Sequence, residues 1–136
     1  MCDDERLNAA VDQIENLEFI LACTSTYPTQ PKDVNLKNIL NLQSKYPKLN
    51  IGFSNHYSGL DACAGAVALG AKCIEFHITH DRTAYGSDQA ASIENTEGLV
   101  SAIRNMEVML GDGDKKFLPE EVEIAKKLRK VDNILS

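Results

Sequence analysis

Two of the three histidines in the chain follow short apolar segments, where they could ligate a metal ion or transfer a proton. His56 ends the segment NIGFSNH, and His77 lies in KCIEFHIT, two residues after Glu75. Imidazole nitrogens and carboxylate oxygens bind divalent metals and also serve in general acid–base catalysis. If the two segments are neighbouring strands, these residues predict a divalent-metal site or an acid–base site at one end of a sheet.

Each polar candidate also has a structural alternative. A single histidine at a strand end is more often a hydrogen-bonded structural residue than a ligand. Ser54 could satisfy a backbone group, Tyr27 could be a packing aromatic, and Asp88 in the segment GSDQ could be a turn residue. The third histidine, His80, has the opposite parity to His77 and starts a charged loop, so we expect it in solvent.

The elements that must position these residues alternate between helix and strand. Apolar spacing predicts helices over 7–17, 34–42, 60–69 and 99–110, a last helix over 119–130, and strands over 18–23, 50–56 and 72–79. Strands that alternate with helices at this spacing are typical of an α/β protein with parallel strands covered by helices. Three strands are too few to close a barrel, so the pattern indicates part of a larger structure.

Strand geometry places the polar candidates on a common face. Side chains alternate between the two faces of a strand, and sites of parallel α/β proteins lie at the carboxyl ends of the strands. The polar face is predicted to carry Cys23, Ser25 and Tyr27 from the first strand, Gly52, Ser54 and His56 from the second, and Cys73, Glu75, His77 and Thr79 from the third. The opposite face is apolar enough to pack against helices.

Composition excludes several classes of function. The 136 residues include 14 basic and 20 acidic side chains, a formal net charge of −6, and the basic residues form no cluster with aromatic ones. We therefore expect neither nucleic acid nor membrane as a partner. An acidic amino terminus without a long apolar run indicates a cytoplasmic protein. Four cysteines without a CxxC pair, two of them in predicted buried strands, are typical of reduced thiols.

Four segments of the sequence carry a resemblance to a known family. They are TSTYPTQPKDVNL, IGFSNHYSGLDACAGAVALGAKCIEFHIT, GSDQAASIE and IRNMEVMLGDG. In this order and spacing they resemble the closing third of the N-acetylneuraminate (sialic acid) synthase barrel, from about Phe19 onward. The resemblance implies a partial TIM-type (β/α)8 barrel, with about the last three β-α units and flanking helices, in one domain over residues 1–136.

The resemblance also implies an activity. Family members condense phosphoenolpyruvate with an N-acyl hexosamine, typically N-acetylmannosamine or its 6-phosphate, to give a nine-carbon 2-keto sugar acid and phosphate. They use a divalent metal, typically Mn²⁺, at the mouth of the barrel. His56 and His77 resemble the two protein ligands of that metal, which would polarise the aldehyde oxygen as a Lewis acid.

The remaining site residues follow from the same resemblance. Glu75 and Asp88 resemble the carboxylates that hold the sugar hydroxyls and orient a metal-bound water, so they join the two histidines as catalytic candidates. Ser25 and Tyr27 resemble the pair that lines the sugar subsite. Ser54 resembles a hydroxyl that hydrogen-bonds the phosphate of phosphoenolpyruvate.

Part of the family's barrel has no counterpart in this sequence. The first five strands, which bind most of phosphoenolpyruvate, and the antifreeze-like carboxy-terminal domain of many members are missing, and the amino terminus looks cut. We therefore expect an inactive chain on its own, which acts as a homo-oligomer or with a complementing barrel fragment. Two alternatives stay open: a non-catalytic relic or module that binds metal or sugar, and another metal-dependent aldolase or hydrolase.

Overall fold

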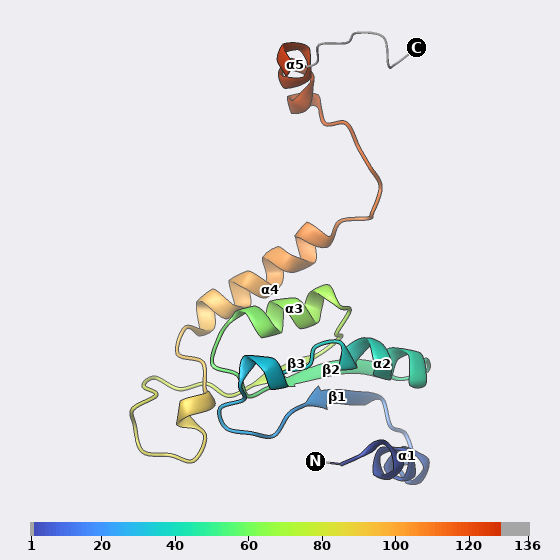
Figure 1. Cartoon of the computed structure of the whole chain (residues 1–136), viewed down its shortest axis with the longest axis vertical. Coiled ribbons are helices and arrows are strands. Elements are labelled where there is room, and N and C mark those ends of the chain that lie inside the picture. The colour runs from blue at the N-terminus through green and yellow to red at the C-terminus, as the bar shows by residue number, and fades with distance from the viewer. Residues whose placement is uncertain (1, 129–136) are drawn as a thin grey trace.

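The fold is a three-stranded parallel sheet with helices on one face. The structure is a computed structural model and describes residues 2–128. The strands, β1 (Phe19–Cys23), β2 (Asn50–Asn55) and β3 (Ile74–Phe76), lie in the order β1-β2-β3. The helices are α1 (Asp4–Gln13), α2 (Asn38–Lys45), α3 (Asp61–Ala68), α4 (Thr96–Leu110) and α5 (Pro119–Leu128). The prediction of an α/β class with parallel strands is confirmed (Figure 1).

One face of the sheet forms the hydrophobic core. Ile20 pairs with Ile51, and Ala22 pairs with Phe53, so their side chains form two buried rows on the same face. Helices α2 and α3 pack on this face, and α4 packs on α3 as a further layer (Figure 1). The small side chains of α3, among them Ala62 and Ala66, are buried between the sheet and α4. They allow the close packing that the alanine-rich sequence predicts.

The other face of the sheet is open. It carries Phe19, Leu21 and Cys23 from β1, all of which are exposed although the residues between them are buried. Gly52 lies under the Leu21 side chain, and a Cβ atom at Gly52 would come within 2.7 Å of the carbonyl oxygen of Cys73. A side chain at this position would therefore push β2 and β3 apart.

Two helices differ from their predicted lengths because asparagines with positive φ interrupt them. The predicted 7–17 helix ends at Gln13, and Asn16 follows with φ 58°. The predicted 34–42 helix begins only at Asn38, as α2; a 3-10 turn, Pro31–Asp33, precedes it, and Asn35 between the two has φ 48°. Asparagine tolerates the left-handed region, where a continuous helix cannot pass. Apolar spacing alone does not reveal such a break.

The third strand is shorter than predicted, and a further pairing was missed. Only Ile74–Phe76 of the predicted 72–79 strand is regular. Beyond it, Ile78 forms an isolated parallel bridge with Ile93, whose N–H donates to His77 O at 2.8 Å. The segment after Ala91, read from sequence as the end of a loop, therefore returns to the edge of the sheet beside β3.

Three further expectations have mixed outcomes. The predicted burial of two cysteines in strands was wrong: Cys23 and Cys73 are exposed, whereas Cys63, in α3, is buried, and all four thiols are free. Gly70 follows α3 with φ 87°, as expected after a helix end. The end of the predicted 119–130 helix lies outside the described residues, and α5 stands apart from the rest of the fold in Figure 1.

We predict that the open face drives self-association. β1 is an edge strand of the described sheet and Leu21 is 37% exposed beside it, so a second polypeptide can pair with the edge and cover the apolar residues. Leu21→Lys should lower the mass measured by light scattering at high concentration. Leu40→Lys, at a similarly exposed leucine of α2 on the helical layer, is the control and should leave the mass unchanged. A sharp monomer peak from the parent chain would contradict the prediction.

Candidate functional site

The parallel register brings polar residues of all three strands into one row. Cys23 pairs with Ser54, and Ser54 pairs with Glu75. All three residues lie on the open face, at or near the carboxyl ends of their strands. The next positions on that face are Ser25, His56 and His77, which follow the strands in sequence. The loops after β1 and β3 both lie at this end of the sheet, on the left in Figure 1.

Three rings form the centre of the site. The ring centroids of His56 and His77 are 5.2 Å apart, and the Tyr27 ring lies 4.2 Å from His56 and 5.9 Å from His77. Tyr27 comes from the loop after β1, so three different segments contribute one ring each. The two histidines that the sequence placed on adjacent strand ends are therefore neighbours in space.

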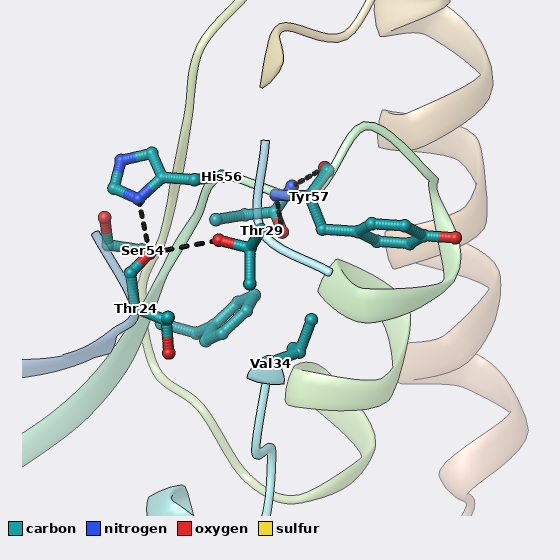
Figure 2. Close-up of a pocket in the computed structure, with 8 residues that line it drawn as sticks. Thr24, Thr29, Val34, Ser54, His56 and Tyr57 are labelled. Carbon is teal, nitrogen blue, oxygen red and sulfur yellow. Dashed lines mark hydrogen bonds between the residues drawn. The ribbon is translucent and has the colours of Figure 1, made fainter. Parts of the chain in front are cut away.

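His56 is held in one orientation by the backbone. Its side chain is almost fully buried, with 5% of the residue exposed, and its Nδ1 lies 2.9 Å from the carbonyl oxygen of Thr24. A carbonyl oxygen can only accept, so Nδ1 is the protonated nitrogen, and in the neutral ring Nε2 carries the lone pair. The same Nδ1 is 3.8 Å from the Cys23 sulfur. Figure 2 shows the second ring nitrogen facing away from Thr24.

The carboxylate of Glu75 is anchored by the neighbouring strand. Ser54 Oγ donates to Glu75 Oε2 at 2.5 Å, a bond that runs directly across the paired positions of β2 and β3. On the other side of Ser54, the Cys23 thiol is 3.5 Å from Ser25 Oγ. Glu75 remains exposed and keeps acceptor capacity for further donors, such as sugar hydroxyls.

The loop after β3 brings a second carboxylate to the site. Asp88 Oδ2 lies 3.7 Å from His77 Nδ1, a distance for an ion pair with protonated imidazole rather than for a hydrogen bond. The loop is closed by Arg82, whose N–H and Nε each lie 2.9 Å from the Glu94 carboxylate and lower the pKa of that carboxyl. His80 is exposed, as predicted, and the loop positions Asp88 rather than His80 near the rings.

The electrostatic field of the site is negative. Partial desolvation, followed by the charges of Asp88, Cys23 and Glu75, raises the pKa of Tyr27 above its ordinary value. The phenol therefore stays protonated and can donate a hydrogen bond. No lysine or arginine forms an ion pair with Glu75 or Asp88 among the described residues, so the arrangement favours a cation at the rings.

The structure brings together the residues that sequence reasoning selected, and it adds others. The rings of His56, His77 and Tyr27 meet, Glu75 and Ser54 are hydrogen-bonded, Ser25 lies beside Cys23, and Asp88 approaches His77. Their chemical roles stay predictions. Sequence reasoning missed the Thr24 carbonyl, which gives no side-chain signal, and Thr29, a buried threonine in a segment read only as a polar turn.

Two absences apply to residues 2–128. Within that range no three His, Cys, Asp or Glu side chains are grouped closely enough to hold a metal ion. In the same range no helix is both long and apolar enough to cross a bilayer.

Parallel strands alternate with helices here, and polar groups lie at the carboxyl ends of the strands. The same arrangement is found in a portion of a (β/α)8-barrel enzyme. A sequence model of the NeuB family matches residues 1–115. The N-acetylneuraminate-9-phosphate synthase of Homo sapiens is 47% identical over 112 residues, 81% of this chain and 31% of that protein. The N,N'-diacetyllegionaminic acid synthase of Legionella pneumophila is 35% identical over 140 residues, 96% of this chain and 39% of that protein.

Solved structures agree with these sequence matches. The N-acetylneuraminic acid (sialic acid) synthetase of Leptospira borgpetersenii, solved with citrate, superposes with a TM-score of 0.65 at 37% identity, covering 83% of this chain and 41% of its own. The chain belongs to the NeuB family, and its fold is a part of the sialic acid synthase fold. It spans between 31% and 39% of the length of the curated relatives named here.

The cysteines of this site and of the core should differ sharply in reactivity. Burial, followed by the charges of Asp61 and Glu75, raises the pKa of Cys63 to about 12, so its thiolate is scarce at pH 8. Iodoacetamide should therefore label Cys2, Cys23 and Cys73 in the native chain and spare Cys63, as read by peptide mass spectrometry. Denatured chain, in which all four should react, is the control. Rapid native labelling of Cys63 would show that α3 is not packed as described.

Proposed function

We propose that the chain carries the metal- and sugar-binding part of a synthase that condenses phosphoenolpyruvate with an N-acyl hexosamine. The observation that carries the proposal is the meeting of His56, His77 and Tyr27 beside two carboxylates at the carboxyl ends of parallel strands. Membership of the NeuB family supports it, because relatives are named N-acetylneuraminate-9-phosphate synthase and N,N'-diacetyllegionaminic acid synthase.

Two imidazoles would give a divalent cation such as Mn²⁺ part of its ligand set, since no third side chain of the described residues is grouped with them. The hydrogen bond from His56 Nδ1 to Thr24 O leaves Nε2 with a lone pair, as a backbone carbonyl commonly does for a histidine that binds a metal through its other nitrogen. His77 Nδ1 faces Asp88 Oδ2 at 3.7 Å, too far for a hydrogen bond, so the neutral ring of His77 could offer Nε2 without a comparable anchor. A bound ion would supply Lewis-acid polarisation of the aldehyde oxygen. Imidazole and oxygen ligands suit manganese-like ions, with the remaining positions filled by water or substrate.

The other side chains of the site suit a polyhydroxylated substrate. Glu75, fixed by Ser54 and exposed on its other side, can accept hydrogen bonds from sugar hydroxyls, and Asp88 can do so from the loop. Tyr27 remains protonated because its pKa is raised, so it can donate to an acceptor oxygen while Ser25 lies nearby. Ser54 Oγ, whose one proton goes to Glu75 in this structure, could donate to the phosphate of phosphoenolpyruvate only by leaving that carboxylate. Holding two substrates in the correct orientation can lower the activation free energy of a bimolecular reaction by a large part.

The three strands carry only part of the groups that this reaction needs. The other groups must come from another polypeptide or from another part of the protein. We infer that phosphoenolpyruvate is bound mainly by elements beyond these strands, in a homo-oligomer or with a complementing barrel fragment, in the cytoplasm. The runner-up is a module that binds metal or sugar without turnover. A different metal-dependent aldolase would use the same rings and carboxylates but would not release phosphate.

Metal binding tests the first part of the proposal. Isothermal titration of the purified chain with Mn²⁺ should show one site, and His56→Ala and His77→Ala should each weaken it by roughly 10-fold or more, because each removes a ligand. His80→Ala removes an exposed histidine of the same loop and should leave the affinity unchanged. Equal binding by all four proteins would place the ion elsewhere and contradict the assignment.

Complementation tests the condensation itself. The chain is mixed with a polypeptide that supplies the missing strands of a NeuB-family barrel, and phosphate release from phosphoenolpyruvate is followed with and without N-acetylmannosamine. Sugar-dependent release is expected, and Glu75→Gln should lower the rate by about 10²-fold or more, since it removes a positioned carboxylate. Glu97→Gln, an exposed glutamate in the first turn of α4, is the matched control. A stable complex without turnover would favour the binding-module alternative.

A further inference from the structure

The loop that follows β1 is fastened to His56 by a buried threonine. Thr29 is 3% exposed, and its backbone N–H donates to the carbonyl oxygen of His56 at 2.9 Å. Its hydroxyl lies 3.1 Å from Thr24 O and 2.9 Å from Thr26 O. A hydroxyl has one proton, which these two carbonyls share. Thr29 therefore connects the residue after β2, His56, to the carbonyl oxygens of Thr24 and Thr26 in the turn after β1.

The hydroxyl of Thr29 and the ring of His56 meet at the same atom. Thr24 O accepts from His56 Nδ1 at 2.9 Å and from Thr29 Oγ1 at 3.1 Å, and Figure 2 shows both bonds converging on it. The Thr24 side chain is tied in turn, since its Oγ1 donates to Asp33 O at 2.9 Å. The acceptor that selects the tautomer of His56 is thus held from two directions.

Thr24 O is the stronger of the two partners of His56 Nδ1. Val34 and Phe53 line the small cavity beside this junction together with Thr24 and Thr29, and the cavity has no room for a water molecule. The Cys23 sulfur, at 3.8 Å from Nδ1, is a weaker partner than a carbonyl oxygen. If Thr24 O moved, the ring could rotate or exchange its proton to Nε2, which would block that nitrogen as a ligand.

We propose that Thr29 is a positioning residue: its buried hydroxyl and N–H hold Thr24 O where it fixes His56 in the Nδ1-protonated tautomer, with Nε2 free to bind. The inference rests on the proposed function only in taking Nε2 as the metal-binding atom. The tautomer itself is a property of the metal-free chain. Thr29 contacts no substrate and acts through Thr24 and His56.

The test separates positioning from folding. In metal-free, ¹⁵N-histidine-labelled chain, long-range ¹H–¹⁵N spectra should show His56 protonated at Nδ1. Thr29→Val keeps the shape of the side chain and removes the hydroxyl, so it should give mixed tautomers of His56. It should also weaken Mn²⁺ binding about 10-fold, as is common when a residue that orients a metal ligand is lost. Thr29→Ser restores the hydroxyl and should behave like the parent. Thr83→Val removes an exposed threonine hydroxyl that bonds Asp81 within the loop after β3, and it should also leave the His56 spectrum unchanged.

The outcomes distinguish this inference from the proposed function. A Thr29→Val chain that unfolds at lower temperature but keeps His56 fully Nδ1-protonated would overturn the positioning role. If that variant does not fold, the parent spectrum decides, because protonation of His56 at Nε2 in the parent would equally overturn it. A tautomer that depends on Thr29 in a parent chain that binds no Mn²⁺ would support the positioning role and count against the metal proposal instead.

Discussion

The parallel register of the three strands is the constraint on which the site depends. Cys23, Ser54 and Glu75 lie at paired positions of β1, β2 and β3, so they form one row across the open face of the sheet. The residues that follow are therefore delivered to one end of the sheet. A shift of one residue in β2 would turn His56 toward the helices and bring Asn55 to the open face. The register is fixed by burial of the opposite face, where Ile51 and Phe53 have almost no exposed surface.

The residues of the site are held by backbone groups more than by one another. His56 donates to a carbonyl, Thr29 joins two carbonyls, and the bridge at Ile93 fixes the segment that contains His77. Direct side-chain bonds are fewer, with Ser54 to Glu75 as the clearest. Backbone anchors restrict the rings without consuming the groups that would meet a substrate. The carboxylates keep acceptor capacity for that reason.

Alternation and strand-end position were enough to select most of the site from sequence. Period-two spacing placed Ser54 with His56 and Glu75 with His77, and the described fold has these residues at one end of the sheet. The buried row of Ile20 and Ala22 follows from the same spacing. These features are local consequences of strand geometry, so a short segment contains the information.

What sequence reasoning missed depends on contacts between distant segments. The bridge between Ile78 and Ile93 spans a long polar loop, and neither residue differs in type from an ordinary core isoleucine. Thr29 looked like one more polar turn residue, because its burial arises only when the turn folds back on the end of β2. The burial of Cys23 was misjudged because an apolar strand was read as buried as a whole, although its alternating side chains place Cys23 on the face that no helix covers.

The open face and the candidate site are one continuous surface, and this couples assembly to chemistry. Leu21 and Phe19 expose apolar area on the same face that carries Glu75 and Cys23, a few residues along the strands. Any polypeptide that buries the apolar part must also come close to the rings. Exclusion of water there would strengthen the interaction of Glu75 and Asp88 with a cation, because charges interact more strongly at lower effective dielectric. The same exclusion would penalise two carboxylates without a cation. Closure of the sheet and occupation of the site by a positive ion are therefore expected to favour each other.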